Sequence, residues 1–180
     1  MKGLMIYSDN MEDGEALLTR DFLLRIGFKI DTVAYNKKEI VTAFGLSVFA
    51  DYKYDEISLN EYNFLIIPGG KYVGQIIDKS KHINDVIVNF YERKKIIAAI
   101  CAAPRFLGKL GLLNDKKFTC FPSCEIDMPK GIYLPNEKAV TDGLIITGRS
   151  VGCVVEFCGE IITNLLSKEA FDKLKKDIVL

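Results

Sequence analysis

The sequence has no apolar run long enough to span a membrane, no excess of either charge and only one histidine. Its longest apolar runs are about half of the roughly 20 residues that a membrane-spanning helix needs. Basic and acidic residues number 24 each, so the net charge does not indicate a nucleic-acid or anionic-membrane partner. Five cysteines, an odd number without paired spacing, argue against a secreted disulfide framework. We therefore expect a cytoplasmic protein that binds neither nucleic acid nor membrane.

The scarcity of histidine limits the chemistry. His82 opens a helical pattern, where it is expected to be a surface or cap-proximal side chain. A cysteine–histidine dyad requires hydrogen-bond reach, and this helix is expected to lie away from the candidate site. The cysteines lack ligand spacing, so we expect no zinc site, no other metal and no cofactor.

Strand and helix patterns alternate along the 180 residues, without a long linker or a repeat. Strands are predicted at 4–7, 29–34, 64–67, 96–100, 139–140 and 144–147, with a short hairpin near Gly45 and 47–50. Helices are predicted at 15–26, 82–94, 104–110, 152–166 and 169–176. This order and the two-sided apolar strands predict one α/β domain, residues 1–180, with a parallel sheet between helical layers.

The most informative stretch is 96–104, in which an apolar run leads into Cys101 and Pro104 then opens a helix. Ala99 and Ala103 flank the cysteine at minus two and plus two, where a nucleophile elbow needs small side chains. A cysteine at such a turn faces a helix N-terminus, which favours the thiolate. We therefore interpret Cys101 as a reactive thiol, against the alternative that it is a small buried hydrophobe.

Loops after the strands 4–7, 64–67 and 96–100 are expected to meet at one edge of the sheet. The loop 68–70 contains Gly69 and Gly70, whose backbone amides can approach a reacting atom because no Cβ intervenes. Together with the amide of Ala102 they could form an oxyanion hole. The alternative is an ordinary glycine turn that ends a strand.

Three acidic residues, Glu12, Asp13 and Glu15, lie at the start of the first helix. Acids at a helix N-terminus are stabilised by the macrodipole, which explains two of the three. Glu15 is interpreted as a carboxyl that points into the crevice. Beside a thiolate it would hold its proton and donate a hydrogen bond.

Arg149 ends the strand 144–147 and precedes a helix. It is either a solvated cation or a group that attracts a carboxylate or phosphate to the crevice. The remaining cysteines are assigned to packing, except one in a polar loop, Cys124, whose role the sequence leaves open.

Glu15, the loop 68–70 and the run 98–104 resemble the ThiJ/PfpI superfamily, closest to the branch of the parkinsonism-associated protein deglycase. The stretches 142–149 and 156–157 continue the resemblance over essentially the whole chain. It implies a flavodoxin-like three-layer sandwich, a homodimer, and an easily oxidised cysteine hydrogen-bonded by a protonated glutamate. By motif position the implied site residues are Cys101 and Glu15, with Gly69, Gly70 and Ala102 on the oxyanion side.

The chain departs from the family pattern at three positions. Ala102 stands where protease-like members have a histidine, and Phe121 where the deglycase branch has one. Phe44 stands where an arginine is often found near the dimer strand. These departures make protease or amidase activity improbable, because no histidine is available.

Two functional hypotheses follow. The first is a cysteine-dependent stress-protection protein of glyoxalase or deglycase type, in which Cys101 attacks small reactive carbonyls with help from Glu15. The second is a non-enzymatic redox sensor or chaperone, whose partner is an oxidant that converts Cys101 to sulfenic and sulfinic acid. A plainer alternative is an oligomeric binding module that keeps the elbow as a relic.

Overall fold

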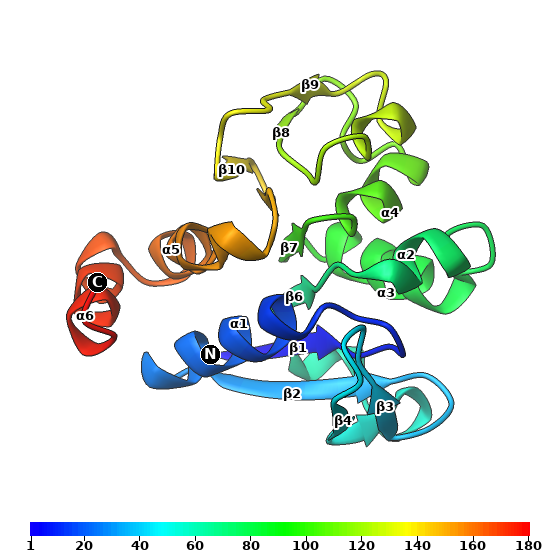
Figure 1. The fold of residues 1–180 in the computed structure, drawn as a ribbon, viewed down its shortest axis with the longest axis horizontal. Coiled ribbons are helices and arrows are strands. Elements are labelled where there is room, and N and C mark those ends of the chain that lie inside the picture. The colour runs from blue at the N-terminus through cyan, green and yellow to red at the C-terminus, as the bar shows by residue number, and fades with distance from the viewer.

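A computed structural model describes residues 1–180, and a seven-stranded sheet forms its middle layer (Figure 1). All neighbouring strands are parallel except β10 and β11, which form an antiparallel pair at one edge. In spatial order the strands are β10 (Ala139–Asp142), β11 (Ile145–Gly148), β7 (Ile96–Ile100), β6 (Phe64–Ile67), β1 (Lys2–Ile6), β2 (Lys29–Ala34) and β5 (Tyr52–Lys53). The predicted mostly parallel sheet is confirmed.

Helices cover both faces of this sheet (Figure 1). They are α1 (Asp13–Arg25), α2 (Lys71–Ile76), α3 (Lys81–Glu92), α4 (Pro104–Lys109), α5 (Val154–Leu165) and α6 (Lys168–Asp177). On one face α1 and α5 pack together, and α6 packs on α5. On the other face α3 packs on β6 and β7 and contacts α4, while α2 lies nearby. The three-layer α/β architecture is therefore as predicted.

Sequence patterns explain the main elements. Every residue of β6 is buried, as expected for an apolar strand covered on both faces. The helix α3 buries its apolar positions at helical spacing: Ile83, Val86, Ile87 and Phe90. The turn between β10 and β11 is made by Gly143 and Leu144, one residue further along than an Asp142–Gly143 turn, because Asp142 pairs with Ile145; Gly143 has the positive φ of 61° that favours glycine.

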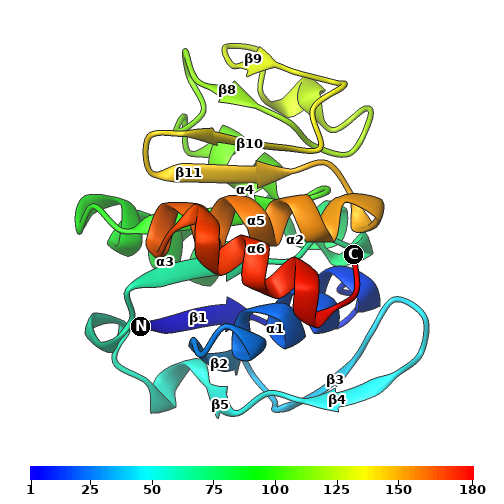
Figure 2. The ribbon, with the colours of Figure 1, turned by 90° about the vertical axis from the view of Figure 1, so that its left-hand side faces the viewer.

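Smaller elements lie around the sheet. The strands β3 (Glu39–Val41) and β4 (Ser47–Phe49) form the expected hairpin around Gly45, which extends away from the body of the fold (Figure 2). Beyond the β10 edge, β8 (Lys117–Phe118) pairs with β9 (Ile132–Tyr133). Short 3-10 turns occur at η1 (Tyr54–Glu56), η2 (Leu59–Glu61), η3 (Glu125–Asp127) and η4 (Val151–Cys153). None of the helices combines the length and apolarity needed to cross a membrane.

The strand order reverses next to β1. The chain leaves β1 through α1 to reach β2 on one side, whereas β6 and β7 lie on the other side. At such a switch point, loops at the carboxyl ends of the strands diverge and leave a crevice. The loops after β1, β6 and β7, at 7–12, 68–70 and 101–103, meet there.

Candidate active site

Cys101 occupies a strained turn between β7 and α4. Its φ of 65° is in the left-handed region, which costs a non-glycine residue about 1–3 kcal/mol. Its backbone N–H donates to Gly148 O at 2.9 Å, and its carbonyl accepts from Phe121 N–H at 2.9 Å, so two other segments hold the turn. Ala99 and Ala103 are fully buried, in agreement with the need for small residues beside an elbow.

The three acidic residues at the start of α1 have different surroundings. Glu12 caps the helix, since its Oε2 accepts from Glu15 N–H at 2.6 Å. Asp13 accepts from the Thr42 hydroxyl at 2.6 Å and thereby anchors the β3–β4 hairpin. Glu15 is instead turned inward, where only 1% of its surface is exposed.

Gly69 joins Glu15 to the elbow. Its N–H donates to Glu15 Oε2 at 2.9 Å, and the Glu15 carboxyl also interacts with the Cys101 thiol and the Val151 backbone amide. A Cβ on Gly69 would lie 2.6 Å from Cys101 Cβ and 2.6 Å from Glu15 Oε2. The two side chains and the Gly69 backbone are thus packed too closely for any larger residue at this position.

Burial raises the pKa of Glu15 to about 7. Its interactions with Cys101 and with the Gly69 amide act in the opposite direction, and the charge of Glu12 adds to the rise. A carboxyl with this pKa exchanges its proton at neutral pH. Glu15 is therefore a carboxyl that can gain and lose a proton without a histidine nearby.

Burial also raises the pKa of the Cys101 thiol well above its usual range, and the neighbouring Glu15 charge raises it further. The Ala102 amide opposes this rise. The expectation of a lowered pKa is therefore wrong, because desolvation of the thiol outweighs the opposing effect of the Ala102 amide. Glu15 and Cys101 therefore titrate as a pair that releases one proton near neutrality and holds the second.

The predicted oxyanion donors differ in their availability. The Gly69 amide is already bonded to Glu15. Gly70 has a φ of 124° and packs so closely on the loop after β1 that a Cβ would lie 2.5 Å from Asn10 O. The Ala102 amide interacts with the Cys101 sulfur. The backbone amides of Gly70 and Ala102 therefore remain as candidate hydrogen-bond donors to a developing oxyanion.

The backbone of Arg149 lies near the site, but its side chain points elsewhere. It follows Gly148, whose carbonyl accepts from Cys101 N–H. Its guanidinium donates to the carbonyls of Pro135 at 3.3 Å and Asn136 at 3.4 Å. The Arg149 guanidinium therefore binds the loop 135–136 and does not lie beside Cys101 or Glu15.

The four remaining cysteines differ in burial. Cys120, Cys153 and Cys158 are buried, as assigned. Cys124 is partly buried. Its charge also raises the pKa of the Cys101 thiol, but less than burial and Glu15 do. Ser123, with φ of 76°, forms the turn that brings Cys124 back toward the elbow.

Sequence reasoning missed one further residue of the site, Tyr72. It is 1% exposed, and its hydroxyl donates to Pro68 O at 2.7 Å, which holds the loop before Gly69. No motif marked it, because an aromatic residue after a glycine pair has no distinctive spacing. No group of three or more His, Cys, Asp or Glu side chains is arranged to hold a metal ion.

The fold and this site together define a flavodoxin-like α/β protein with a cysteine on a nucleophile elbow and a buried glutamate beside it. A family model described as the DJ-1/PfpI family matches residues 1–164. The chain therefore belongs to the DJ-1/PfpI family, as its resemblance to the ThiJ/PfpI superfamily indicated.

Known relatives agree with this assignment. The protein dj-1beta of Drosophila melanogaster is 27% identical over 179 residues, which cover 98% of this chain and 96% of that protein. A protein of Pyrococcus abyssi named as a deglycase is 24% identical over 166 residues, covering 92% of this chain and 99% of that protein.

Solved structures agree as well. The crystal structure of Drosophila melanogaster DJ-1beta superposes with a TM-score of 0.92 at 25% identity, covering 99% of this chain and 97% of that one. A structure of Toxoplasma gondii DJ-1 described as oxidized has a TM-score of 0.87 at 25% identity, again covering 99% and 97%.

Proposed function

We propose that this protein acts on small reactive carbonyls through Cys101, with Glu15 as the group that accepts and returns protons. The observation that carries the proposal is the buried Glu15 carboxyl, whose pKa is raised by burial to about 7, beside a cysteine on an elbow. A group with a pKa near the working pH serves as both acid and base. The deglycase name of the Pyrococcus abyssi relative supports the same class of substrate.

The first chemical step is addition of the Cys101 sulfur to the aldehyde carbon. Glu15 carboxylate takes the thiol proton as the carbon–sulfur bond forms, so no preformed thiolate and no histidine are needed. The carbonyl oxygen becomes negative and accepts hydrogen bonds from the amides of Gly70 and Ala102. Glu15 then returns the proton to this oxygen, which gives a hemithioacetal.

The remaining steps return the enzyme to its starting state. With methylglyoxal, Glu15 takes the proton from the former aldehyde carbon while the adjacent ketone oxygen gains a proton, which gives an enediol. Return of a proton to the adjacent carbon and loss of the proton from the first hydroxyl then leave a lactoyl thioester on Cys101. Water hydrolyses the thioester and restores the thiol. The net change is methylglyoxal plus water to lactate, an internal oxidation and reduction that needs no external oxidant or cofactor.

The test is lactate production from methylglyoxal. The wild-type protein should exceed Cys101→Ala, and Glu15→Gln should lose about 10²- to 10⁴-fold, the usual contribution of general acid–base catalysis. Glu12→Gln is the matched control, because Glu12 is a nearby carboxylate that caps α1 and does not contact the thiol. Wild-type activity no higher than that of Cys101→Ala would overturn the proposal.

A second candidate function is redox sensing by the same cysteine. The description of the Toxoplasma gondii relative as oxidized favours it, and so does the Glu15 carboxyl beside Cys101, which in its protonated form could donate to a sulfinate oxygen. One peroxide converts the thiol to sulfenic acid and water, and a second gives sulfinic acid. Mild peroxide should then add two oxygens to Cys101 first; equal oxidation of all five cysteines would contradict it. Failure of both tests would favour a binding module with a relic elbow.

We further propose a cytoplasmic homodimer assembled through the β3–β4 hairpin. Phe44 and Phe49 at this hairpin are 77% and 70% exposed. Val41 and Leu46 are also exposed there, so a contiguous segment presents apolar surface to solvent. Phe44 stands where related chains often have an arginine near the dimer strand, so here the contact would be apolar.

A further inference from the structure

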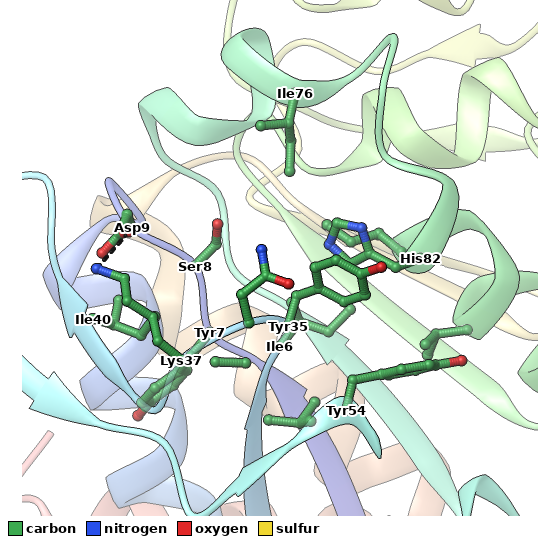
Figure 3. A pocket seen from close by; sticks show the side chains of 15 residues that line it. Ile6, Tyr7, Ser8, Asp9, Tyr35, Lys37, Ile40, Tyr54, Ile76 and His82 are labelled. Atoms are coloured by element: carbon green, nitrogen blue, oxygen red, sulfur yellow. Dashed lines mark ion pairs between the residues drawn. The ribbon is translucent and has the colours of Figure 1, made fainter. Parts of the chain in front are cut away.

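A cavity of about 220 Å³ lies at the carboxyl ends of β1 and β2 (Figure 3). Its floor is aliphatic and comes from both strands and from α3, with Ile6, Val33, Ile83 and Val86 in its lining. Neither Cys101 nor Glu15 contributes to it. The proposed chemistry at the elbow therefore does not account for this cavity.

One wall of the cavity is aromatic. The rings of Tyr35 and His82 stack with centroids 4.0 Å apart and planes inclined by 18°. Tyr54 lies beside them, 6.2 Å from Tyr35 at 51° (Figure 3). Burial lowers the pKa of His82, so this wall is an uncharged π surface at neutral pH. The single histidine of the chain is thus neither a simple surface group nor part of the elbow site.

The opposite side of the cavity is polar. Lys37 Nζ and Asp9 Oδ2 form an ion pair at 3.0 Å, on the other side of the view from the Tyr35–His82 stack (Figure 3). Because these charges neutralise each other, the edge offers hydrogen bonds without a net charge. Ser8 lies between the ion pair and the aromatic wall and supplies a neutral hydroxyl.

We propose that this cavity binds a neutral, planar, bicyclic aromatic molecule that carries one hydrogen-bonding group. An engineered apolar cavity of about 150 Å³ binds benzene, so the larger volume here suits two fused rings. Planarity matches the Tyr35–His82 wall, and neutrality matches the aliphatic floor and the paired charges. The ring stacks on the wall while its polar group reaches Ser8 or the Asp9–Lys37 pair.

The cavity and the elbow site lie on opposite sides of the loop after β1. Asp9 borders the cavity, whereas Glu12 N–H donates to Gly69 O at 2.9 Å next to the elbow. Binding in the cavity is therefore separable from chemistry at Cys101, and Cys101→Ser should not change it.

The proposal is tested with 2-naphthol as the probe and decahydro-2-naphthol as its saturated control. Backbone amide shifts are followed by NMR during titration of the full-length protein. The expected result is saturable shifts at 33–37 and 82–86 with 2-naphthol and at least tenfold weaker binding of the saturated alcohol. Shifts confined to other residues, or equal binding of the two alcohols, would overturn the proposal.

Variants provide an independent test. Tyr35→Ala should weaken 2-naphthol binding about tenfold, because it removes the exposed half of the stack. Tyr52→Ala is the matched control, since Tyr52 is another exposed tyrosine and does not line the cavity. An equal effect of the two variants would contradict the proposed site.

Discussion

Glu15 and Cys101 come from opposite halves of the chain, yet their side chains interact directly and each alters the pKa of the other. Only 1% of Glu15 is exposed, and the Gly69 amide fixes one of its oxygens at 2.9 Å. The result is a pair that exchanges a single proton near neutral pH. Under the proposed mechanism Glu15 takes the place of a histidine base, since the one histidine, His82, lies outside this site.

The reactivity of Cys101 should depend on Glu15 in its charged form. In wild type, alkylation of Cys101 by iodoacetamide should accelerate as pH rises through about 7, where Glu15 becomes able to take the thiol proton. In Glu15→Gln this inflection should disappear, and the rate at pH 7.5 should fall about 10²-fold or more. The rate is measured by mass spectrometry of the Cys101 peptide. Identical profiles for Glu15→Gln and the control Glu12→Gln would count against the role of Glu15.

Glu15 should also make stability fall with rising pH. Its pKa of about 7 in the folded protein lies above 4.5, the ordinary value of a glutamate, so between these pH values the folded state binds a proton that the unfolded state has lost. The free energy of unfolding therefore decreases as pH rises from 4.5 through 7. The protonated Glu15 contributes about 3 kcal/mol at most, and this contribution is lost above pH 7. Urea unfolding at pH 5.5 and 8 should show this loss in wild type and a smaller one in Glu15→Gln. A loss of equal size in both proteins would assign it to other groups.

Gly69 should not tolerate a methyl group. In Gly69→Ala the new Cβ would meet Cys101 and Glu15 at 2.6 Å, which forces a shift costing about 1–3 kcal/mol. Gly152→Ala is the matched control, because no atom lies within 4 Å of its added Cβ and its φ is not positive. Urea unfolding measures both changes. A loss no greater for Gly69→Ala than for Gly152→Ala would contradict the packing described here.

The proposed homodimer should depend on the β3–β4 hairpin. Phe44→Lys and Phe49→Lys would place charge where apolar surface is buried between copies, and should each shift the protein toward its monomer mass of 20.2 kDa. Ile132→Lys, on β9, is the control for an exposed isoleucine elsewhere. Sedimentation equilibrium distinguishes the species. A wild-type protein that is monomeric at all concentrations would refute the proposal.

The layers of the fold and the sharp turn at Cys101 can be predicted from the sequence. Continuous apolar runs such as 64–67 and helical spacing in α3 identify the layers, because burial on both faces demands them. The small residues around Cys101 identify the elbow, since only they fit its turn. The acids near the start of α1 could be separated by position, which identified Glu15.

Other features depend on three-dimensional contacts that no local pattern records. The raised pKa of Cys101 follows from burial and from a carboxyl distant in sequence. The direction of the Arg149 side chain depends on carbonyls in the loop 135–136. The stack of Tyr35 on His82 joins a loop after β2 to the start of α3, and neither segment carries a motif.

A carbon-13 NMR titration of the Glu15 carboxyl tests the central claim most directly. Selective labelling and the Glu15→Gln spectrum assign the resonance. The account predicts a transition at a pH of about 7, as burial of the carboxyl requires. A transition near 4.5, the value of an ordinary glutamate, would show that Glu15 is not the proton carrier of this site.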